Sequence, residues 1–127
     1  MILVIGGACQ GKLKLVCSWL GKDIDRSLYA DGATDCWLEI NNKPVVYRVQ
    51  DYLKRGLEEQ RDMEAWIRQL IAADPDYVIM DEVGYGIVPL QKEQRFYREE
   101  AGRAGQQLAR AAAAVYRVVC GIPVQIK

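Results

Sequence analysis

The opening segment of this chain constrains its fold more than any other. Residues 2–12 read Ile-Leu-Val-Ile-Gly-Gly-Ala-Cys-Gln-Gly-Lys, a short apolar run that leads into a glycine-rich loop ending in lysine. The spacing Gly6-x-x-x-x-Gly11-Lys12 is typical of a P-loop, in which backbone N–H groups and the next helix start face a phosphate. We therefore predict that this loop binds phosphate, through Gly6, Gly7, Ala8, Cys9, Gln10, Gly11, Lys12 and Leu13.

Position 13 departs from the usual pattern of such loops. A serine or threonine hydroxyl normally follows the lysine and holds Mg²⁺, but this chain has Leu13 there. The loop is therefore expected to bind phosphate without this ligand to the metal.

Composition limits the classes of protein to which the chain can belong. Its 127 residues suggest a single domain, residues 1–127. Seventeen basic residues balance seventeen acidic ones, so nothing indicates a nucleic acid or an anionic membrane as partner. The first apolar run stops at Gly6, far short of the roughly 20 residues that a membrane span needs, so we expect no membrane span and a cytoplasmic location.

Cysteine and histidine usage narrows the chemistry further. Cys9, Cys17, Cys36 and Cys120 are scattered with no C-x-x-C pair, so we expect reduced and mostly buried thiols rather than a zinc or redox site. The sequence contains no histidine, which excludes histidine as base, metal ligand or covalent nucleophile within it.

The order of apolar patterns along the chain predicts the fold class. Strands are expected at 2–5, 77–80 and 116–120, helices at 12–20, 51–73 (with a break at Gly56 as one option) and 91–115, loops at 22–35 and 81–90, and a tail at 121–127. The β-prone runs 36–40 and 44–49 form either a hairpin or a loop followed by one parallel strand. This alternation predicts an α/β, P-loop NTPase-like fold with a mostly parallel sheet flanked by helices.

A second candidate site follows the strand at 77–80. Asp81 and Glu82 come where that strand ends, and the carboxyl ends of parallel strands meet at one edge of a sheet, beside the phosphate loop. Asp81 is placed to hold Mg²⁺, and Glu82 to orient or deprotonate an attacking hydroxyl. A solvated acidic turn is the alternative, and the pairing with a P-loop favours the functional interpretation.

Two further groups carry weaker signals. Arginine suits phosphate recognition, but a solvated helix face explains Arg95, Arg98 and Arg103 equally well. Aromatic rings can stack on a nucleotide base, but core packing is the simpler interpretation of Tyr29, Trp37 and Tyr47.

Residues 81–89 read Asp-Glu-Val-Gly-Tyr-Gly-Ile-Val-Pro. This string resembles the Asn-Glu-Val-Gly-x-Gly-Ile-Val-Pro motif of the bifunctional adenosylcobinamide kinase / adenosylcobinamide-phosphate guanylyltransferase family. The likeness continues through Arg95-x-x-Arg98-x-x-x-Gly102-Arg103, Gln106, Leu108-Ala109 and the ending Val-Val-Cys-Gly-Ile-Pro-Val-Gln-Ile-Lys127. The opening Ile-Gly-Gly-Ala-x-x-Gly-Lys12 is similar to that family's first strand and phosphate loop.

The resemblance implies a P-loop α/β fold, a trimer, and two reactions of corrinoid salvage and cobalamin biosynthesis. In the family, ATP or GTP phosphorylates the aminopropanol hydroxyl of adenosylcobinamide, and GMP is then attached through a covalent histidine intermediate. By position, Gly6–Lys12 would bind the triphosphate, and Glu82, Val83 and Gly84 would lie at the edge of the nucleotide site. The three arginines would support that site or a subunit contact.

The chain departs from the family pattern at several positions. It has no histidine to carry GMP, the segment between the first helix and residue 45 is shorter, and Leu13 replaces the hydroxyl ligand. Asp81 and Gly105 each replace an asparagine. Histidine-dependent guanylyl transfer is therefore not expected, whereas phosphoryl transfer depends mainly on positioning and charge neutralisation and does not need histidine.

Two hypotheses about function follow. In the first, the chain is a nucleotide-binding kinase-like protein, in which Lys12 holds the β- and γ-phosphates of ATP or GTP, Asp81 holds Mg²⁺, and Glu82 orients the hydroxyl of a corrinoid substrate. In the second, it is a non-catalytic module that binds a nucleotide, a corrinoid or a partner enzyme. Lys12 with Asp81 and Glu82 favours the first hypothesis, and Leu13 with the missing histidine favours the second.

Overall fold

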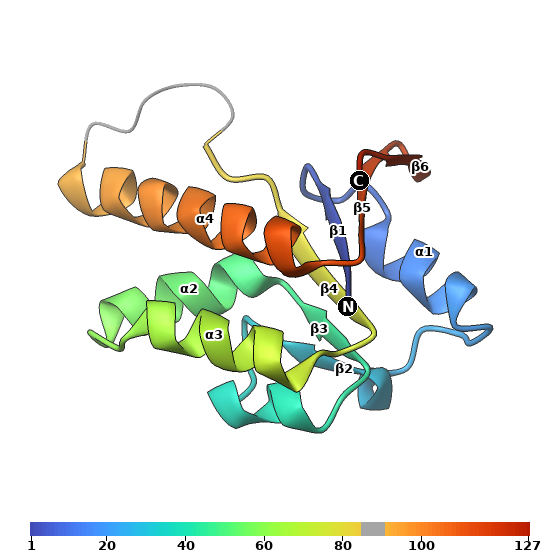
Figure 1. The fold of residues 1–127 in the computed structure, drawn as a ribbon, viewed down its shortest axis with the longest axis horizontal. Coiled ribbons are helices and arrows are strands. Elements are labelled where there is room, and N and C mark those ends of the chain that lie inside the picture. The colour runs from blue at the N-terminus through green and yellow to red at the C-terminus, as the bar shows by residue number, and fades with distance from the viewer. Residues whose placement is uncertain (85–90) are drawn as a thin grey trace.

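A computed structural model describes residues 1–84 and 91–127, and Figure 1 shows its fold. Its elements, in chain order, are β1 (Ile2–Gly6), α1 (Lys12–Trp19), β2 (Tyr29–Asp31), β3 (Val45–Tyr47), α2 (Val49–Glu58), α3 (Met63–Ala73), β4 (Tyr77–Asp81), α4 (Lys92–Ala111), β5 (Ala114–Val119) and β6 (Ile122–Gln125). Short 3-10 turns lie at Arg26–Leu28 and Trp37–Asn41. Part of the loop expected at 81–90, with Gly86 and Pro89, falls outside the described residues.

The strands form one sheet in the order β2-β3-β4-β1-β5-β6. The first five are parallel to their neighbours, and β6 alone runs antiparallel, along β5. The predicted α/β fold with a mostly parallel sheet is therefore confirmed. Because β1 lies between β4 and β5, the loop that follows β1 emerges next to the carboxyl ends of both neighbours.

Helices cover the two faces of the sheet unequally. Helices α2, α3 and α4 lie on one face and α1 lies on the other (Figure 1). Successive residues of a strand point to opposite faces, so Leu3 joins the larger core under α2, α3 and α4, whereas Val4 joins a smaller core that includes Val16 of α1. The side chains of Leu3 and Val4 are both fully buried, as expected for the centre of an apolar parallel strand.

The segment before α2 differs from the expectation of a loop over 22–35. Tyr29–Asp31 forms β2, which pairs in parallel with β3, while Trp37–Asn41 forms a 3-10 turn instead of a strand. Of the two alternatives for 36–49, the loop followed by one parallel strand is thus the correct one. Strands of three residues carry too little periodicity to be recognised, and tertiary pairing stabilises them.

The helical pattern over 51–73 divides into two helices, but not at Gly56. The break falls at residues 59–62, where Gln60 has φ 57° and the Asp62 side chain caps α3 by accepting a hydrogen bond from the Ala65 N–H. Gly56 instead allows close packing, because a Cβ there would lie 1.9 Å from the Met63 sulfur. Helix α4 ends at Ala111, earlier than the expected residue 115.

The end of the chain is a strand rather than the expected tail. β5 and β6 form a hairpin in which Val119 pairs with Ile122, and the two turn residues, Cys120 and Gly121, have φ of 51° and 76°. Both therefore lie in the left-handed region that a type I′ turn requires, where asparagine and glycine are favoured and cysteine is not.

Cys120→Asn is therefore expected to stabilise the hairpin, by about 0.5–1 kcal/mol, because asparagine tolerates the left-handed conformation better than cysteine. Urea unfolding under reducing conditions measures the change, with Cys36→Asn as a control at another exposed position. An unchanged or lower free energy of unfolding for Cys120→Asn would contradict the assignment of this turn.

Within residues 1–84 and 91–127, no helix combines the length and the apolar character that crossing a membrane requires.

Candidate functional site

The predicted phosphate loop connects the end of β1 to the start of α1. Gly6, the last residue of β1, is the register partner of Asp81, the last residue of β4, so the loop begins beside the acidic end of β4. Cys9 and Gly11 have φ of 59° and 85°, and these left-handed residues turn the backbone back toward α1. The structure thus places the loop and Asp81 at the same edge of the sheet.

A cavity of about 510 Å³ lies in front of this loop. It is bounded by the loop, the ends of β3 and β4, and the first turn of α2, and its lining residues are Ala8, Cys9, Gln10, Gly11, Lys12, Leu13, Lys14, Tyr47, Arg48, Gln50, Asp51 and Asp81. Sequence reasoning named the loop residues and Asp81 but missed the segment 48–51. The signal that could have found it is its position at the carboxyl end of a parallel strand.

Lys12 is folded back into the protein. Its side chain is 3% exposed, and its ammonium group lies 2.6 Å from Asp81 Oδ1, 2.5 Å from the Gly7 carbonyl oxygen and 3.2 Å from the Gly6 carbonyl oxygen. Three acceptors match the three donors of a lysine ammonium group. The ion pair therefore joins the two residues that sequence reasoning placed at the nucleotide phosphates and at Mg²⁺.

Asp81 is held by α2 as well as by Lys12. The Gln50 side chain is buried, and its amide oxygen accepts a hydrogen bond of 3.0 Å from the Asp81 N–H. Asp51, the next residue of α2, lines the cavity. The pKa of the Asp51 carboxyl lies above its ordinary value, mainly because the group is buried. The positive charge of Arg48 lowers this pKa, whereas the negative charges of Asp81 and Asp31 raise it further.

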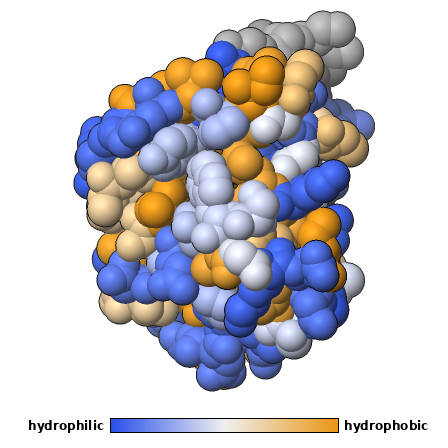
Figure 2. All heavy atoms as spheres, turned by 90° about the vertical axis from the view of Figure 1, so that its right-hand side faces the viewer, coloured by the Kyte–Doolittle hydropathy of each residue, from blue (hydrophilic) through white to orange (hydrophobic). Residues whose placement is uncertain are grey.

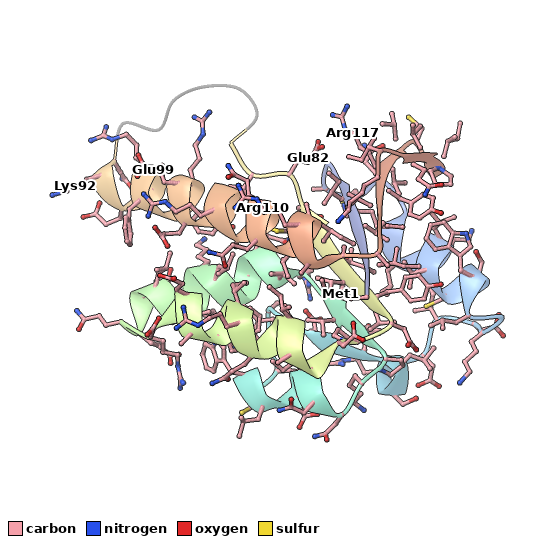
Figure 3. All side chains as sticks on the ribbon, viewed as in Figure 1. Met1, Glu82, Lys92, Glu99, Arg110 and Arg117 are labelled. Atoms are coloured by element: carbon pink, nitrogen blue, oxygen red, sulfur yellow. The ribbon has the colours of Figure 1, made fainter. Side chains whose placement is uncertain are left out.

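Glu82 lies beside the β5 strand. Its carboxylate accepts hydrogen bonds of 2.8 and 3.1 Å from the Arg117 guanidinium, and the two side chains lie close together in Figure 3. Its backbone N–H donates to the Gly6 carbonyl oxygen at 3.0 Å. Glu82 is therefore adjacent to the loop through its backbone, while both carboxylate oxygens are engaged by Arg117.

Val83 and Gly84 line a different cavity, of about 600 Å³, between α2 and α4. The Arg98 side chain lies over Gly84, where a Cβ would come within 2.3 Å of the Arg98 Nε. Arg103 instead pairs with Glu100 on the exposed surface of α4, at 2.6 Å. The structure therefore brings Arg98 to the segment that follows β4 and leaves Arg103 paired on the surface of α4.

The three aromatic residues considered as base-stacking groups pack against other aromatic rings. Tyr29 and Tyr47 meet edge to face with centroids 5.6 Å apart, and Trp37 lies 6.3 Å from Tyr52. The Arg61 guanidinium lies over the Trp37 ring, with its Cζ 3.9 Å from the ring centroid. Of the three, Tyr47 also lines the cavity in front of the loop.

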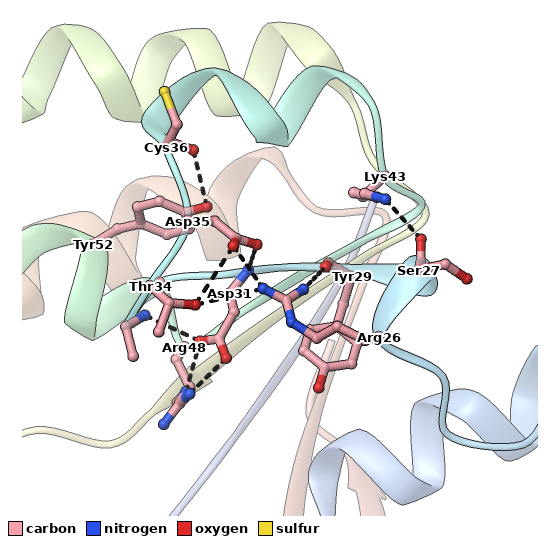
Figure 4. Close-up of polar contacts among 12 residues, drawn as sticks. Arg26, Ser27, Tyr29, Asp31, Thr34, Asp35, Cys36, Lys43, Arg48 and Tyr52 are labelled. Atoms are coloured by element: carbon pink, nitrogen blue, oxygen red, sulfur yellow. Dashed lines mark hydrogen bonds and ion pairs between the residues drawn. The ribbon is translucent and has the colours of Figure 1, made fainter.

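A network of charged side chains supports the cavity wall at the end of β2 (Figure 4). Arg48 donates two hydrogen bonds to Asp31, from Nε at 2.8 Å and from Nη2 at 2.5 Å, and Arg26 donates to Asp35 at 2.6 Å. Burial raises the pKa of the Asp31 carboxyl, but bonds from Arg48 and the Ala33 N–H and the arginine charges lower it more, so its pKa lies below the ordinary value.

Asp31→Asn is expected to weaken the fold at neutral pH, by about 1.5 kcal/mol, because one charged hydrogen-bond partner of Arg48 is lost. A lowered native pKa means that ionised Asp31 stabilises the fold above the unfolded pKa of about 4, and that this contribution disappears as the pH falls through the native value. Urea unfolding at pH 7, 4 and 3 should thus show a stability gap between wild type and variant that closes toward low pH. A constant gap would contradict this account.

In the described part of the chain, no group of three or more Asp, Glu, His or Cys side chains could hold a metal ion. The expectation of mostly buried thiols is wrong, because Cys9, Cys36 and Cys120 are exposed. Only Cys17, on the core face of α1, is buried, and burial raises the pKa of its thiol.

The sheet is mostly parallel, and its first strand in the chain is followed by a glycine-rich loop and by a helix that begins at Lys12. This arrangement defines a P-loop-like α/β protein. Comparison with known proteins identifies the family within this class. The family model of cobinamide kinase / cobinamide phosphate guanyltransferase matches residues 45–126, more than half of the chain, and the chain belongs to that family.

Two curated relatives are similar to this chain. The bifunctional adenosylcobalamin biosynthesis protein CobU of Escherichia coli is 47% identical over 73 residues, which are 54% of this chain and 40% of that protein. The protein of the same name from Salmonella typhimurium is 45% identical over the same shares. The match thus spans less than half the length of these relatives.

Proposed function

We propose that this chain is a nucleotide-binding, adenosylcobinamide kinase-like protein of cobalamin biosynthesis, which transfers a phosphoryl group from ATP or GTP to a corrinoid side-chain hydroxyl. Family membership supports the pathway. The observation that carries the proposal is the Lys12–Asp81 ion pair at the wall of the 510 Å³ cavity. This pair places two groups at the cavity wall: the ammonium group of Lys12, which would bind a polyphosphate, and the carboxylate of Asp81, which would bind the Mg²⁺ that accompanies it.

Binding of a polyphosphate would change the partners of Lys12. The loop carbonyls that it contacts are weaker partners for an ammonium group than a phosphate oxygen is, so the side chain would turn from them toward the β- and γ-phosphates. Asp81 would then lose its cation, and it is an oxygen ligand of the kind that Mg²⁺ prefers. The Leu13 side chain offers no oxygen, so Asp81 and the phosphates would hold the ion, which would neutralise developing charge on the transferred group.

Two carboxylates are candidates for orienting the acceptor hydroxyl. Both oxygens of Glu82 already accept from Arg117 at 2.8 and 3.1 Å, whereas Asp51 lines the cavity and forms a looser ion pair, 3.8 Å from the Arg48 Nε. Burial and neighbouring acids also raise the pKa of Asp51. A pKa above the ordinary carboxyl value makes Asp51 a better proton acceptor than an unperturbed aspartate. We therefore assign this role to Asp51, with Glu82 and Arg117 holding the end of β4 in place.

We propose no guanylyl transfer through a histidine, because this sequence contains none. An acid-labile bond between GMP and the protein, detected after incubation with radiolabelled GTP, would contradict this part of the proposal.

We further propose that residues 1–127 act as one nucleotide-binding domain that associates with copies of itself. Val119, Ile122, Val124 and Ile126 are each about half exposed or more, and strand alternation with the β5–β6 register places them on one face of the hairpin. The side of the molecule that carries α1 and β6 shows hydrophobic residues among hydrophilic ones (Figure 2). Sedimentation should then show an oligomer that Val124→Lys dissociates, and a monomeric wild type would contradict the association.

A non-catalytic role is the alternative, and Leu13 is the observation that favours it. With a leucine at the metal-ligand position and all Lys12 donors engaged inside the protein, the chain would bind a nucleotide or a corrinoid without transferring phosphate.

Thermal unfolding with ATP or GTP, with and without Mg²⁺, separates the two roles. A ligand stabilises the folded state in proportion to its occupancy, so a shift that requires Mg²⁺ supports the kinase, and a shift indifferent to Mg²⁺ supports the binding module. Labelled phosphate should move from γ-labelled ATP or GTP to adenosylcobinamide if the protein is a kinase. Absence of any shift with either nucleotide would contradict both the kinase and a nucleotide-binding module.

A further inference from the structure

Two hydrogen bonds attach the turn between β5 and β6 to Gln10 of the phosphate loop. The Cys120 N–H donates to the Gln10 side-chain oxygen at 2.6 Å, and the Gly121 N–H donates to the Gln10 carbonyl oxygen at 2.9 Å. The loop lies near residue 10 of the chain and the turn near residue 120, so these two bonds close a long-range contact.

The backbone conformation of the turn explains why its N–H groups bond to Gln10. Both residues of the hairpin turn have positive φ, which aims successive N–H groups away from the strands, and here both groups find an acceptor on Gln10. The backbones also approach closely, because a Cβ on Gly11 would lie 3.7 Å from the Gly121 Cα. The Gln10 side chain packs beside Gly7, where a Cβ would lie 3.6 Å from its Cγ.

The contact involves the part of the loop that would face a ligand. Gln10 lies between two left-handed residues, Cys9 and Gly11, and all three line the 510 Å³ cavity. A loop held in one conformation loses less conformational freedom when it binds than a loop that must be ordered by the ligand. A contact that holds Gln10 would therefore be expected to increase the affinity of the loop for an anion.

We propose that Gln10 is a positioning residue, which clamps the phosphate loop to the Cys120–Gly121 turn and so orders the backbone donors of the loop before a polyphosphate binds. The clamp makes the β5–β6 hairpin part of the nucleotide site, although no hairpin residue lies in the loop itself. This inference rests on the proposed nucleotide binding, and its test is designed to separate the two.

Gln10→Met tests the clamp, because methionine keeps the length of the side chain and removes the amide oxygen that accepts from Cys120. Gln125→Met is the matched control: the same change on β6 removes an exposed side chain whose amide donates to the Lys127 carbonyl oxygen instead of contacting the loop. Backbone amide hydrogen exchange by NMR, and dissociation constants for ATP and for inorganic triphosphate, are measured for the full chain of each variant.

In Gln10→Met, the Cys120 amide is expected to lose its protection from exchange while the β1 and β4 amides keep theirs. Both dissociation constants should rise about five- to tenfold, as the loss of one net hydrogen bond predicts, and Gln125→Met should match wild type in both readouts.

An unchanged Cys120 exchange rate, or unchanged affinities despite faster exchange, would overturn the clamp. Equal weakening in Gln125→Met would also overturn it, because the effect would then be a general loss of hairpin stability. If wild type binds neither ATP nor triphosphate, the proposed function fails, and exchange of the Gly7–Gly11 amides then decides the clamp alone: faster exchange in Gln10→Met supports it, and an unchanged rate overturns it.

Discussion

Lys12→Met is expected to abolish the stabilisation of this protein by ATP or GTP. Methionine keeps most of the buried stem of the side chain and removes the ammonium group, the cation that contacts both the loop carbonyls and Asp81. Removing one partner of a buried charge pair in a binding site costs about 3 kcal/mol, which is roughly a hundredfold in dissociation constant. Calorimetric titration with each nucleotide measures this loss.

A second variant separates lost binding from lost stability. Lys12→Met leaves the Asp81 carboxylate without its cation, so the variant is also expected to unfold more easily than wild type. Adding Asp81→Asn removes the unpaired charge, and the double variant should regain stability but not nucleotide binding. If Lys12→Met binds ATP as tightly as wild type, the assignment of Lys12 to the phosphates is wrong.

Gly6→Ala is expected to have the largest effect on folding among these substitutions. Gly6 has φ 151°, and a Cβ there would lie 2.4 Å from the Val118 carbonyl oxygen of β5. Val118 is a fully buried strand residue whose backbone cannot move aside without disturbing the pairing of β1 with β5. We expect a loss of about 3 kcal/mol or more in the free energy of unfolding, measured by urea denaturation.

Gly102→Ala provides the matched control. Gly102 lies inside α4, and a Cβ there meets no atom within 4 Å. Alanine is the better helix former, so this variant should be more stable than wild type by about 0.5–1 kcal/mol. Similar stabilities for the two variants would show that Gly6 is not required by close packing against β5.

The fold class could be predicted because several elements carry a clear local pattern in the sequence. The apolar β1, the α1 start after Gly11 and the two-sided burial of β4 follow from patterns that local burial imposes. β2 and β6 could not be predicted in the same way. Tyr29–Asp31 is too short to show a period, and all four residues of β6 are exposed, so only pairing with a neighbouring strand makes either segment a strand.

The candidate site was predicted in part, for a related reason. The loop and Asp81 are recognisable because each lies where a strand ends, and parallel strands bring such residues to one edge. Segment 48–51 was missed because β3 itself was ambiguous in sequence. The partner of Glu82 was missed because Arg117 is 35 residues away, and its place opposite Glu82 depends on the position of β5 in the sheet.

The sequence by itself determined that a lysine ends a glycine-rich loop after a buried strand, that an acidic pair ends another strand, and that no histidine is present to carry GMP. Those properties are local and follow from residue type and spacing. Only the tertiary structure decided that Lys12 contacts Asp81, that Arg117 binds Glu82, and that the last hairpin holds Gln10. Each of these contacts joins distant parts of the chain, so its existence depends on strand order and not on the residues near it in sequence.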